Sequence, residues 1–329
     1  MTLRNLAVAG ERWPLETPFR IARGVRTEAD VVVVSLSQDG MLGRGEGAPI
    51  ARYGDSVERC VAELEALRGP IESGMNRREL LSAMKPGAAR NALDCALWDL
   101  EARLAGTNVA ALIGTKLATD QITAMTISLD APAAMAAAAA RVASFPLLKI
   151  KVNADDPAVQ IAAIRAAAPN ATLIADANES WSLDLLRAMQ PALAAARIAL
   201  LEQPLPAGED QALRGFSPLV PICADESCHT TEDLARLDGL YQAVNIKLDK
   251  TGGLTAALEL LAAVRARGLT VMTGCMICTS LSIAPAFYIA AAADFADLDG
   301  PTWLAKDRDG GVVLNRGILM PPAAGLWGG

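Results

Sequence analysis

Short apolar segments alternate with alanine-rich helical patterns over most of the chain after residue 121. Eight segments read as β-strands, and each of the first seven is followed by a segment with helical periodicity. Strands that alternate with helices form parallel sheets, and this number of units favours closure into a barrel. The eight segments are ITAMTISL, LLKIKV, TLIADA, IALLEQ, PICADE, AVNIKL, TVMTG and FADLD.

The first 120 residues follow a different pattern, in which strands come before helices. The segment VVVVSLSQDGMLGRGEG predicts a β-hairpin that turns at Asp39-Gly40. Helical patterns follow at about residues 56–67 and 87–105. This order is typical of an α+β unit. The string GRGEG is not a nucleotide loop, because API continues it as a loop and no helix follows.

Composition narrows the class of protein. The 329 residues are 52% hydrophobic and 20% charged, which supplies a core large enough for a barrel and a smaller domain. The net charge is −7 without a Lys/Arg cluster, so we expect no nucleic-acid partner. No apolar run reaches the roughly 20 residues of a membrane span, and MTLRNLAVAGERW lacks the apolar stretch of a signal peptide. We therefore expect a cytoplasmic protein with no membrane partner.

Cysteine and histidine give little sign of chemistry of their own. One C-x-x-C pair occurs, Cys275 and Cys278, and no second pair has matching spacing. We interpret the six cysteines as reduced, packed thiols. The sole histidine, His229, excludes a histidine-rich metal site and any Ser-His-Asp triad that does not use it. We expect its role to be structural.

Seven of the predicted strands end in a polar or charged residue, at spacings of 22 to 28 residues, about one strand-helix unit each. In a TIM barrel these strand ends converge on the face where active sites form. Buried charges are costly unless they are paired or metal-bound. Separate helix caps or surface charges would not repeat at this spacing. The residues are Lys149, Asp176, Glu202, Asp225, Lys247, Cys275 and Asp297.

Three of these strand ends are consecutive carboxylates. Asp176, Glu202 and Asp225 should line one arc of the barrel mouth, where they would repel one another unless a cation lay between them. Oxygen ligation without cysteine or histidine suits a hard ion, and magnesium is favoured over manganese or calcium. Asn178 and Glu179 follow Asp176 and are candidates for support of the ligands.

Lysines flank this predicted metal site. Lys149 and Lys151 alternate along one strand and share a face, and Lys247 ends a strand about half the barrel away. A lysine can remove the proton next to a carboxylate while a metal stabilises the resulting charge. We expect Lys149 and the cation to lower the pKa of Lys151. One base suffices for elimination, whereas two bases across the carbon allow inversion.

The order KIKVN, DANESW, LEQPLP, ADES and NIKLDKTGG resembles the enolase superfamily in its muconate lactonising enzyme subgroup. The resemblance implies an α/β fold, a modified TIM barrel (β/α)7β with an N-terminal α+β capping domain. It implies Lys151 and Lys247 as the acid/base pair, Lys149 as an electrostatic helper, and one Mg²⁺ on Asp176, Glu202 and Asp225. We place the capping domain at 1–120, the barrel at 121–305, and a segment returning to the capping domain at 306–329.

Within this subgroup, GCMICTS and FADLDGPTWL resemble the dipeptide epimerases, particularly those that act on L-Ala-D/L-Glu in murein peptide metabolism. The resemblance implies that Asp297 and Asp299 bind the substrate ammonium group. It also implies Thr126, Cys275 and Ile277 as pocket residues. A glutamyl side chain would need a cationic partner from the N-terminal loops. We assign Arg23, although the alternatives are Arg20, Arg26 and Arg52.

Three other functions remain open at this point. A cycloisomerase or o-succinylbenzoate synthase of the same subgroup would act on substrates without an ammonium group. A Schiff-base lyase on a barrel would use a lysine at a strand end and no metal. A non-catalytic binding protein would not need the full set of lysines and carboxylates. The alanine-rich helices leave the oligomeric state open.

Overall fold

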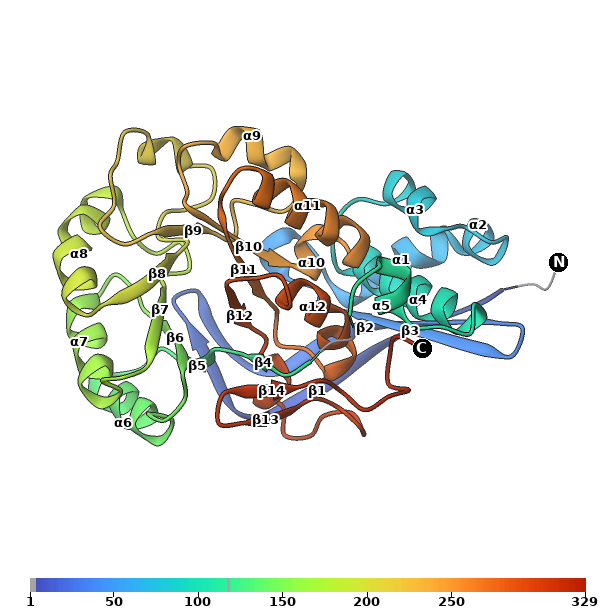
Figure 1. Ribbon diagram of the computed structural model, residues 1–329, viewed down its shortest axis with the longest axis horizontal. Helices are drawn as coiled ribbons and strands as arrows, with labels where there is room; N and C mark the ends of the chain where they lie inside the picture. The colour runs from blue at the N-terminus through green and yellow to red at the C-terminus, as the bar shows by residue number, and fades with distance from the viewer. Residues whose placement is uncertain (1–3, 117–118) are drawn as a thin grey trace.

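The computed structural model describes residues 4–116 and 119–329, in which an eight-stranded parallel sheet forms the centre (Figure 1). The first and last strands approach each other, because Ala124 N donates to Ala296 O at 2.8 Å and Leu298 N donates to Thr123 Oγ1 at 2.8 Å. The predicted (β/α)7β barrel is therefore confirmed. Its strands are β5 (Met125–Ile127), β6 (Leu147–Lys151), β7 (Thr172–Asp176), β8 (Ile198–Glu202), β9 (Ile222–Ala224), β10 (Ala243–Lys247), β11 (Thr270–Gly274) and β12 (Phe295–Asp297).

Helices pack around the outside of the barrel, as the alternating pattern predicts. The prediction of a helix after every strand is wrong after β8, where only the 3-10 helix η2 (Asp210–Leu213) forms. Pro204, Pro206 and Gly208 occupy this connection, and proline cannot supply the donor that an α-helix needs. The helices that follow the other barrel strands are α6 (Pro132–Arg141), α7 (Pro157–Ala167), α8 (Leu183–Ala195), η3 (Thr231–Asp233), α9 (Leu234–Leu237), α10 (Leu248–Thr251), α11 (Leu254–Ala266) and α12 (Ser280–Ala290).

The N-terminal part is an antiparallel sheet covered by helices. Its strands are β1 (Asn5–Ile21), β2 (Gly24–Gln38) and β3 (Met41–Gly47). The predicted hairpin turn is confirmed, because Gln38 pairs with Met41 across Asp39 and Gly40, which both have positive φ. The remaining elements are η1 (Ala51–Tyr53), α1 (Val57–Ala66), α2 (Arg68–Glu72), α3 (Arg77–Ala83), α4 (Ala88–Leu104) and α5 (Val109–Ile113).

The glycines of GRGEG lie in β3 and let the strand approach helix α4. A Cβ atom at Gly45 would collide with the carbonyl oxygen of Ala92, and one at Gly47 with that of Ala88. Helix α4 is buried along most of its length between this sheet and the barrel. The glycines therefore serve helix packing, which agrees with the rejection of a nucleotide loop.

A small third sheet joins distant segments. The predicted strand ITAMTISL is divided: β4 (Gln121–Ile122) pairs with β14 (Ile318–Met320), whereas β5 belongs to the barrel. Strand β13 (Val313–Asn315) completes this sheet. Residues 326–328 contact helix α4, since Trp327 Nε1 donates to Cys95 O at 3.0 Å and Gly328 N donates to Asp99 Oδ1 at 2.8 Å.

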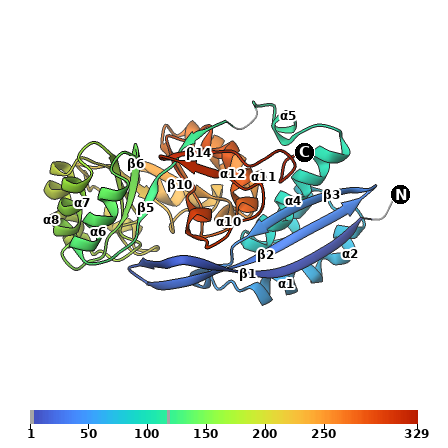
Figure 2. The same ribbon diagram turned by 90° about the horizontal axis from the view of Figure 1, so that it is seen from below.

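Buried polar contacts fix the N-terminal part to the barrel. Asp249 Oδ1 accepts from Ala48 N at 2.9 Å and from Asn91 Nδ2 at 2.8 Å. Asp94 Oδ2 accepts from Thr255 N at 2.9 Å. From this anchored base, the β1–β2 hairpin extends along the barrel, as Figure 2 shows. Its tip therefore reaches the barrel mouth.

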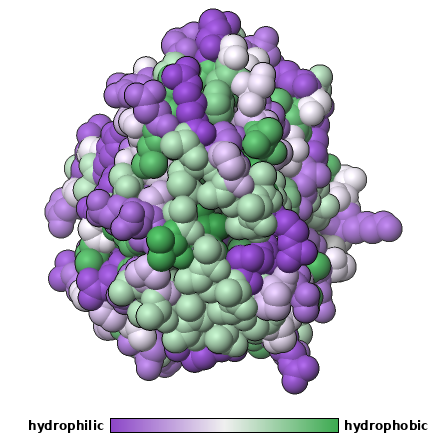
Figure 3. Space-filling model, turned by 90° about the vertical axis from the view of Figure 1, so that its left-hand side faces the viewer, coloured by the Kyte–Doolittle hydropathy of each residue, from purple (hydrophilic) through white to green (hydrophobic). Residues whose placement is uncertain are grey.

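Within residues 4–116 and 119–329, none of the helices combines the length and the apolar character needed to cross a bilayer. Figure 3 shows the face on the α6–α8 side, where weakly hydrophobic surface in pale green is bordered by hydrophilic side chains. Alanine is weakly hydrophobic, and helix α6 on this side has the alanine-rich sequence PAAMAAAAAR.

Candidate active site

The charged strand ends predicted from the sequence meet in one buried cluster at the barrel mouth. Lys149 lies at its centre and is 1% exposed. Its Nζ atom is 3.0 Å from Asp176 Oδ2, 2.6 Å from Glu202 Oε2 and 2.8 Å from Asp297 Oδ2. Three carboxylates from three different strands therefore share one ammonium group, which offsets the cost of burying them.

The other two lysines lie on opposite sides of this centre. Strands β6 and β10 are four places apart in the eight-stranded order, so Lys151 and Lys247 approach the cavity from opposing strands. Lys151 Nζ is 2.6 Å from Asp176 Oδ2, and Lys247 Nζ is 2.7 Å from Asp225 Oδ2. Each lysine is thus held by a candidate metal ligand.

The ionisation of the cluster follows from its burial and close pairing. Burial acts to lower the pKa of Lys149, but Asp297, Glu202 and Asp176 raise it well above its ordinary value. Burial likewise opposes a charged Asp176, yet the neighbouring lysines leave the pKa of this carboxyl lowered. Glu202 differs, because burial and then repulsion by Asp176 raise its pKa to about 8.

The three candidate ligands fit a hard divalent cation in their chemistry, because all three are buried carboxylates next to positive charge. Asp176, Glu202 and Asp225 are at most 2% exposed and end adjacent strands. Among the described residues, Glu202 Oε2 contacts the ammonium group of Lys149 at 2.6 Å, and Asp225 Oδ1 contacts that of Lys250 at 2.8 Å. In the part of the chain described, the carboxylates do not converge in the geometry of a formed metal site; Lys149 Nζ contacts both Asp176 and Glu202. All-oxygen ligation suits magnesium.

Backbone strain follows directly after two of these ligands. Asn178 and Glu179 have φ of 43° and 67°, and Gln203, which follows Glu202, has φ of 33°. Side chains other than glycine rarely adopt this region, and such strain gathers at functional sites. Here it directs Asn178 back toward Asp176, to which the backbone N donates at 2.9 Å. The predicted support of Asp176 by Asn178 is confirmed. Glu179 instead contacts Arg23 and Arg52, which belong to the N-terminal segments over the barrel mouth. We call these segments the cover of the site.

The two aspartates of FADLD have different surroundings. Asp299 Oδ2 accepts from Thr126 N at 2.8 Å and from Trp303 Nε1 at 3.3 Å. Asp297 binds Lys149 through Oδ2, while its buried Oδ1 accepts no hydrogen bond from the described residues. Burial and then Asp297 raise the pKa of Asp299 to about 6. Asp297 therefore keeps a free acceptor at the cavity, whereas both bonds to Asp299 use its Oδ2 atom.

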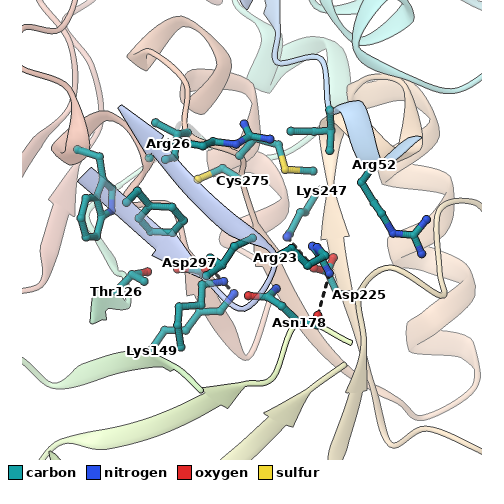
Figure 4. A pocket seen from close by; sticks show the side chains of 18 of the residues that line it. Arg23, Arg26, Arg52, Thr126, Lys149, Asn178, Asp225, Lys247, Cys275 and Asp297 are labelled. Carbon is teal, nitrogen blue, oxygen red and sulfur yellow. Dashed lines mark hydrogen bonds and ion pairs between the residues drawn. The ribbon is translucent and has the colours of Figure 1, made fainter. Parts of the chain in front are cut away.

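A cavity of about 430 Å³ lies over the cluster, between the barrel mouth and the β1–β2 hairpin (Figure 4). The predicted pocket residues Thr126, Cys275 and Ile277 all line it. Glu202 and Asp176 lie beneath it and are fully buried. Several residues of the wall were not singled out from the sequence, among them Phe19, Tyr53, Glu226 and Trp303.

Two of these aromatic residues, Phe19 and Trp303, form an apolar part of the cavity wall. The rings of Phe19 and Trp303 pack edge to face with centroids 4.7 Å apart, and Lys151 Nζ lies 5.9 Å from the centroid of Phe19. Tyr53 packs edge to face on His229, 4.7 Å between centroids. Burial, followed by Lys250, lowers the pKa of His229 to about 4, which keeps the imidazole neutral. The periodicity of each segment gave no sign of these contacts.

Arg23 lies at the cavity but is already paired. Its Nη1 donates to Glu179 Oε2 and its Nη2 to Glu226 Oε1, both at 2.8 Å. Arg52 Nη2 donates to Glu179 Oε1 at 2.9 Å. These contacts tie the cover to residues that follow the candidate ligands Asp176 and Asp225. We define the arginine clamp as Arg23 and Arg52 with Glu179 and Glu226.

The cysteines are free thiols, as predicted, and five of the six are buried. Cys275 is half-buried at the cavity. A hydrogen bond with the Cys275 side chain, and then burial, raise the pKa of the Cys278 thiol well above its ordinary range. The predicted packed-thiol role thus agrees with their placement.

Comparisons with known proteins identify similar chains. Residues 133–326 match the family described as enolase C-terminal domain-like, and residues 3–114 match the N-terminal domain of mandelate racemase/muconate lactonizing enzyme. The L-Ala-D/L-Glu epimerase of Escherichia coli (strain K12) is 49% identical, with 96% of this chain and 99% of that protein covered.

Solved structures agree with this similarity. An enolase family member from Agrobacterium tumefaciens with homology to dipeptide epimerases, solved with sodium and L-Ala-L-Glu, is 48% identical with a TM-score of 0.97 over 99% of this chain and 100% of that one. The dipeptide epimerase of Enterococcus faecalis V583, complexed with Mg and L-Leu-L-Tyr, is 30% identical with a TM-score of 0.91 over 100% and 99% of the two chains.

Proposed function

The chain belongs to the mandelate racemase/muconate lactonizing enzyme family of enolase-like proteins, and we propose that it is a Mg²⁺-dependent dipeptide epimerase that acts on L-Ala-D/L-Glu. The observation that carries this proposal is the pair of lysines that enter one cavity from opposing strands, Lys151 and Lys247. Two groups on opposite faces of one carbon can remove a proton on one side and return it on the other.

The substrate ammonium group belongs at Asp297. The free Oδ1 of this aspartate is a buried acceptor at the cavity, and a charged donor there would satisfy it. Asp299 also lines the cavity and would share this role, while its Oδ2 atom holds the end of β5 and the Trp303 ring in place. In this arrangement, the dipeptide N-terminus lies on the β5–β12 side of the mouth.

Proton transfer then uses the two lysines in turn. In one direction, Lys151 as the free amine takes the α-proton of the glutamyl residue, and Lys247 as the ammonium ion delivers a proton to the opposite face. The reverse reaction exchanges the two roles. Burial acts to lower the pKa of Lys247, but attraction by Asp225 raises it, which favours the ammonium form of this lysine. Lys149 places a fixed positive charge between the carboxylates.

The metal would be held by Asp176, Glu202 and Asp225. When bound there, Mg²⁺ supplies positive charge that stabilises the carboxylate of the deprotonated substrate. Asn178 and Asn245 keep two of these ligands oriented, since Asn178 N donates to Asp176 Oδ1 at 2.9 Å and Asn245 Nδ2 donates to Glu202 Oε1 at 2.7 Å.

Proton NMR in deuterated water tests the proposal. Incubation of L-Ala-L-Glu with the enzyme and Mg²⁺ should give both loss of the glutamyl α-proton signal and appearance of L-Ala-D-Glu. Substrates without an ammonium group, such as the o-succinylbenzoate precursor or a muconate, should turn over poorly. Failure to exchange or invert any member of a dipeptide panel would rule out the epimerase. Turnover of the substrates without an ammonium group would instead favour the cycloisomerase or synthase alternative.

A further inference from the structure

The C-x-x-C pair takes no step in the proposed proton transfer. It lies between β11 and α12, where Cys275 directly follows the strand and Cys278 precedes Thr279, the residue that caps the helix. All six cysteines belong to the described part of the chain; five of them are buried, and Cys275 is half-buried at the cavity (Figure 4). Cys275 is thus the cysteine that a small reagent in the cavity can reach.

The two sulfur atoms of the pair border the same small space. A Cβ atom at Gly300 would lie 3.0 Å from Cys275 Sγ and 3.3 Å from Cys278 Sγ. The Cys278 thiol also forms a hydrogen bond with the Cys275 side chain. Because residue 300 is glycine, it leaves this space free for the sulfur atoms to turn toward each other.

The segment that carries the pair is anchored at both ends. Gly274, just before Cys275, pairs with Lys247 in the barrel sheet. Thr279 N, just after the pair, donates to Glu46 Oε1 at 2.8 Å. Cys278 itself is fully buried in the core of the barrel. The second thiol is therefore shielded from solvent but held beside the first.

We propose that Cys275 and Cys278 form a redox-active dithiol in the cavity wall, which a small disulfide converts into an intramolecular disulfide bond. The Cys275 sulfur attacks one sulfur of the reagent, and the other half of the reagent leaves as a thiolate. The Cys278 sulfur then attacks Cys275 Sγ, and the second half leaves. The protein thiols lose two electrons to the reagent, and their two protons pass to water. This inference goes beyond the proposed function and does not depend on it.

The two thiols have different tasks because their surroundings differ. The hydrogen bond with Cys275, and then burial, raise the pKa of the Cys278 thiol, so this cysteine is a poor starting point for exchange. In the mixed disulfide, however, it lies beside the sulfur that it attacks, and this proximity offsets its low reactivity. The disulfide bond would close the loop that carries Met276 and Ile277, both of which line the cavity.

The aromatic disulfide dithiobisnitrobenzoate tests the pair on the native, full-length enzyme, because its thiolate is a good leaving group and absorbs visible light. We expect release of about two thionitrobenzoates per chain with no reagent left on the protein, since the second thiol displaces it. Mass spectrometry of the intact chain should show the loss of two hydrogen atoms. The unreduced tryptic peptide 268–306, which contains both cysteines of the pair and no other, should carry the whole change. Dithiothreitol should reverse it.

Three variants separate the two tasks. Cys275→Ser should release almost no thionitrobenzoate, because the accessible thiol is gone. Cys278→Ala should release about one per chain and keep the other half of the reagent on Cys275, since nothing displaces it. Cys60→Ala is the matched control, because it removes a buried cysteine of the N-terminal unit, and it should behave as the wild type.

Each other outcome would overturn the inference. Wild-type enzyme that keeps the reagent as an adduct, or that does not react, has no redox-active pair. Full release in Cys275→Ser, or a disulfide bond outside peptide 268–306, would place the reaction at other cysteines. Should a variant not fold, the wild-type mass and peptide still decide. None of these measurements uses a dipeptide, so failure of the epimerase assay would overturn the proposed function alone.

Discussion

The floor and the cover of the cavity hold their charges in different ways. On the floor, Lys149 is 1% exposed and is held by three carboxylates from three strands. On the cover, the side chains of Arg23 and Arg52 are 33% and 46% exposed and contact only residues of the opposing loops. A buried ammonium group that contacts several carboxylates holds all of these side chains in place. An exposed ion pair is screened by water and salt, so it breaks and re-forms more readily. The charged groups of the barrel floor are therefore fixed in place, whereas the ion pairs of the hairpin can break more readily.

The largest expected effect comes from removal of one floor lysine. Lys247→Ala should lower epimerisation by about 10²- to 10⁴-fold, because the proton can no longer be delivered on its face. Exchange of the α-proton should persist for one epimer only, through Lys151, and Lys151→Ala should show the converse. Proton NMR in deuterated water measures both processes. Equal loss of exchange for both epimers in each variant would contradict the two-base arrangement.

Loss of a metal ligand should come next. Glu202→Gln replaces a carboxylate with a neutral amide, and we expect Mg²⁺ to bind at least about 10- to 100-fold more weakly. Isothermal titration calorimetry with MgCl₂ measures this change without reliance on activity. Glu209→Gln is the matched control, because Glu209 is exposed and outside the cavity. Equal Mg²⁺ affinity for Glu202→Gln and the wild type would place the metal elsewhere.

A change at the ammonium site should cost less and should depend on the substrate. Asp297→Asn should lower kcat/KM for L-Ala-L-Glu by about 10- to 100-fold, since a charged contact is lost. N-acetyl-glutamate, which has no ammonium group, should not suffer this loss. Asp309→Asn, at an exposed aspartate of a nearby loop, is the control. An identical loss for both substrates would show that Asp297 acts only by holding Lys149.

The smallest effect is expected from the arginine clamp. Arg52→Met removes an ion pair with Glu179, but Glu179 keeps its contacts with Arg23 and with Ala207 N. Exposed pairs contribute about 0–1 kcal/mol, so kcat/KM should fall less than about fivefold for charged and neutral dipeptides alike. Arg59→Met, which breaks an exposed pair with Glu63 away from the cavity, is the control. A large loss would mean that the cover is as rigid as the floor.

The same contrast explains which features could be predicted from the sequence. Periodicity identified the barrel because each strand is buried on both faces and reads as a short apolar run. The floor was predictable because its residues recur at the end of each unit, from Lys149 to Asp297. That regularity is a property of the fold itself, so local sequence was enough to reveal it.

The cover, and the places where the sequence-based prediction differs from the structure, depend on contacts between segments that are far apart in the chain. Strand β1 carries Pro14 and is largely exposed, so its pattern does not read as a strand. Its register, which places Phe19 opposite Arg26, comes from pairing with β2. The division between β4 and β5 reflects pairing of β4 with β14, nearly 200 residues away. Glu226 follows a predicted ligand, but its pairing with Arg23 requires the folded hairpin.

The contact between residues 326–328 and helix α4 has a consequence for synthesis on the ribosome. The α4 groups that accept these bonds, Cys95 O and Asp99 Oδ1, are made more than 200 residues before Trp327 and Gly328. During translation, the N-terminal sheet and α4 are therefore present long before these partners. Completion of the N-terminal unit must therefore wait until the whole barrel has been synthesised. The N-terminal unit therefore gains its last contacts only after the barrel has been made, although its own strands are synthesised first.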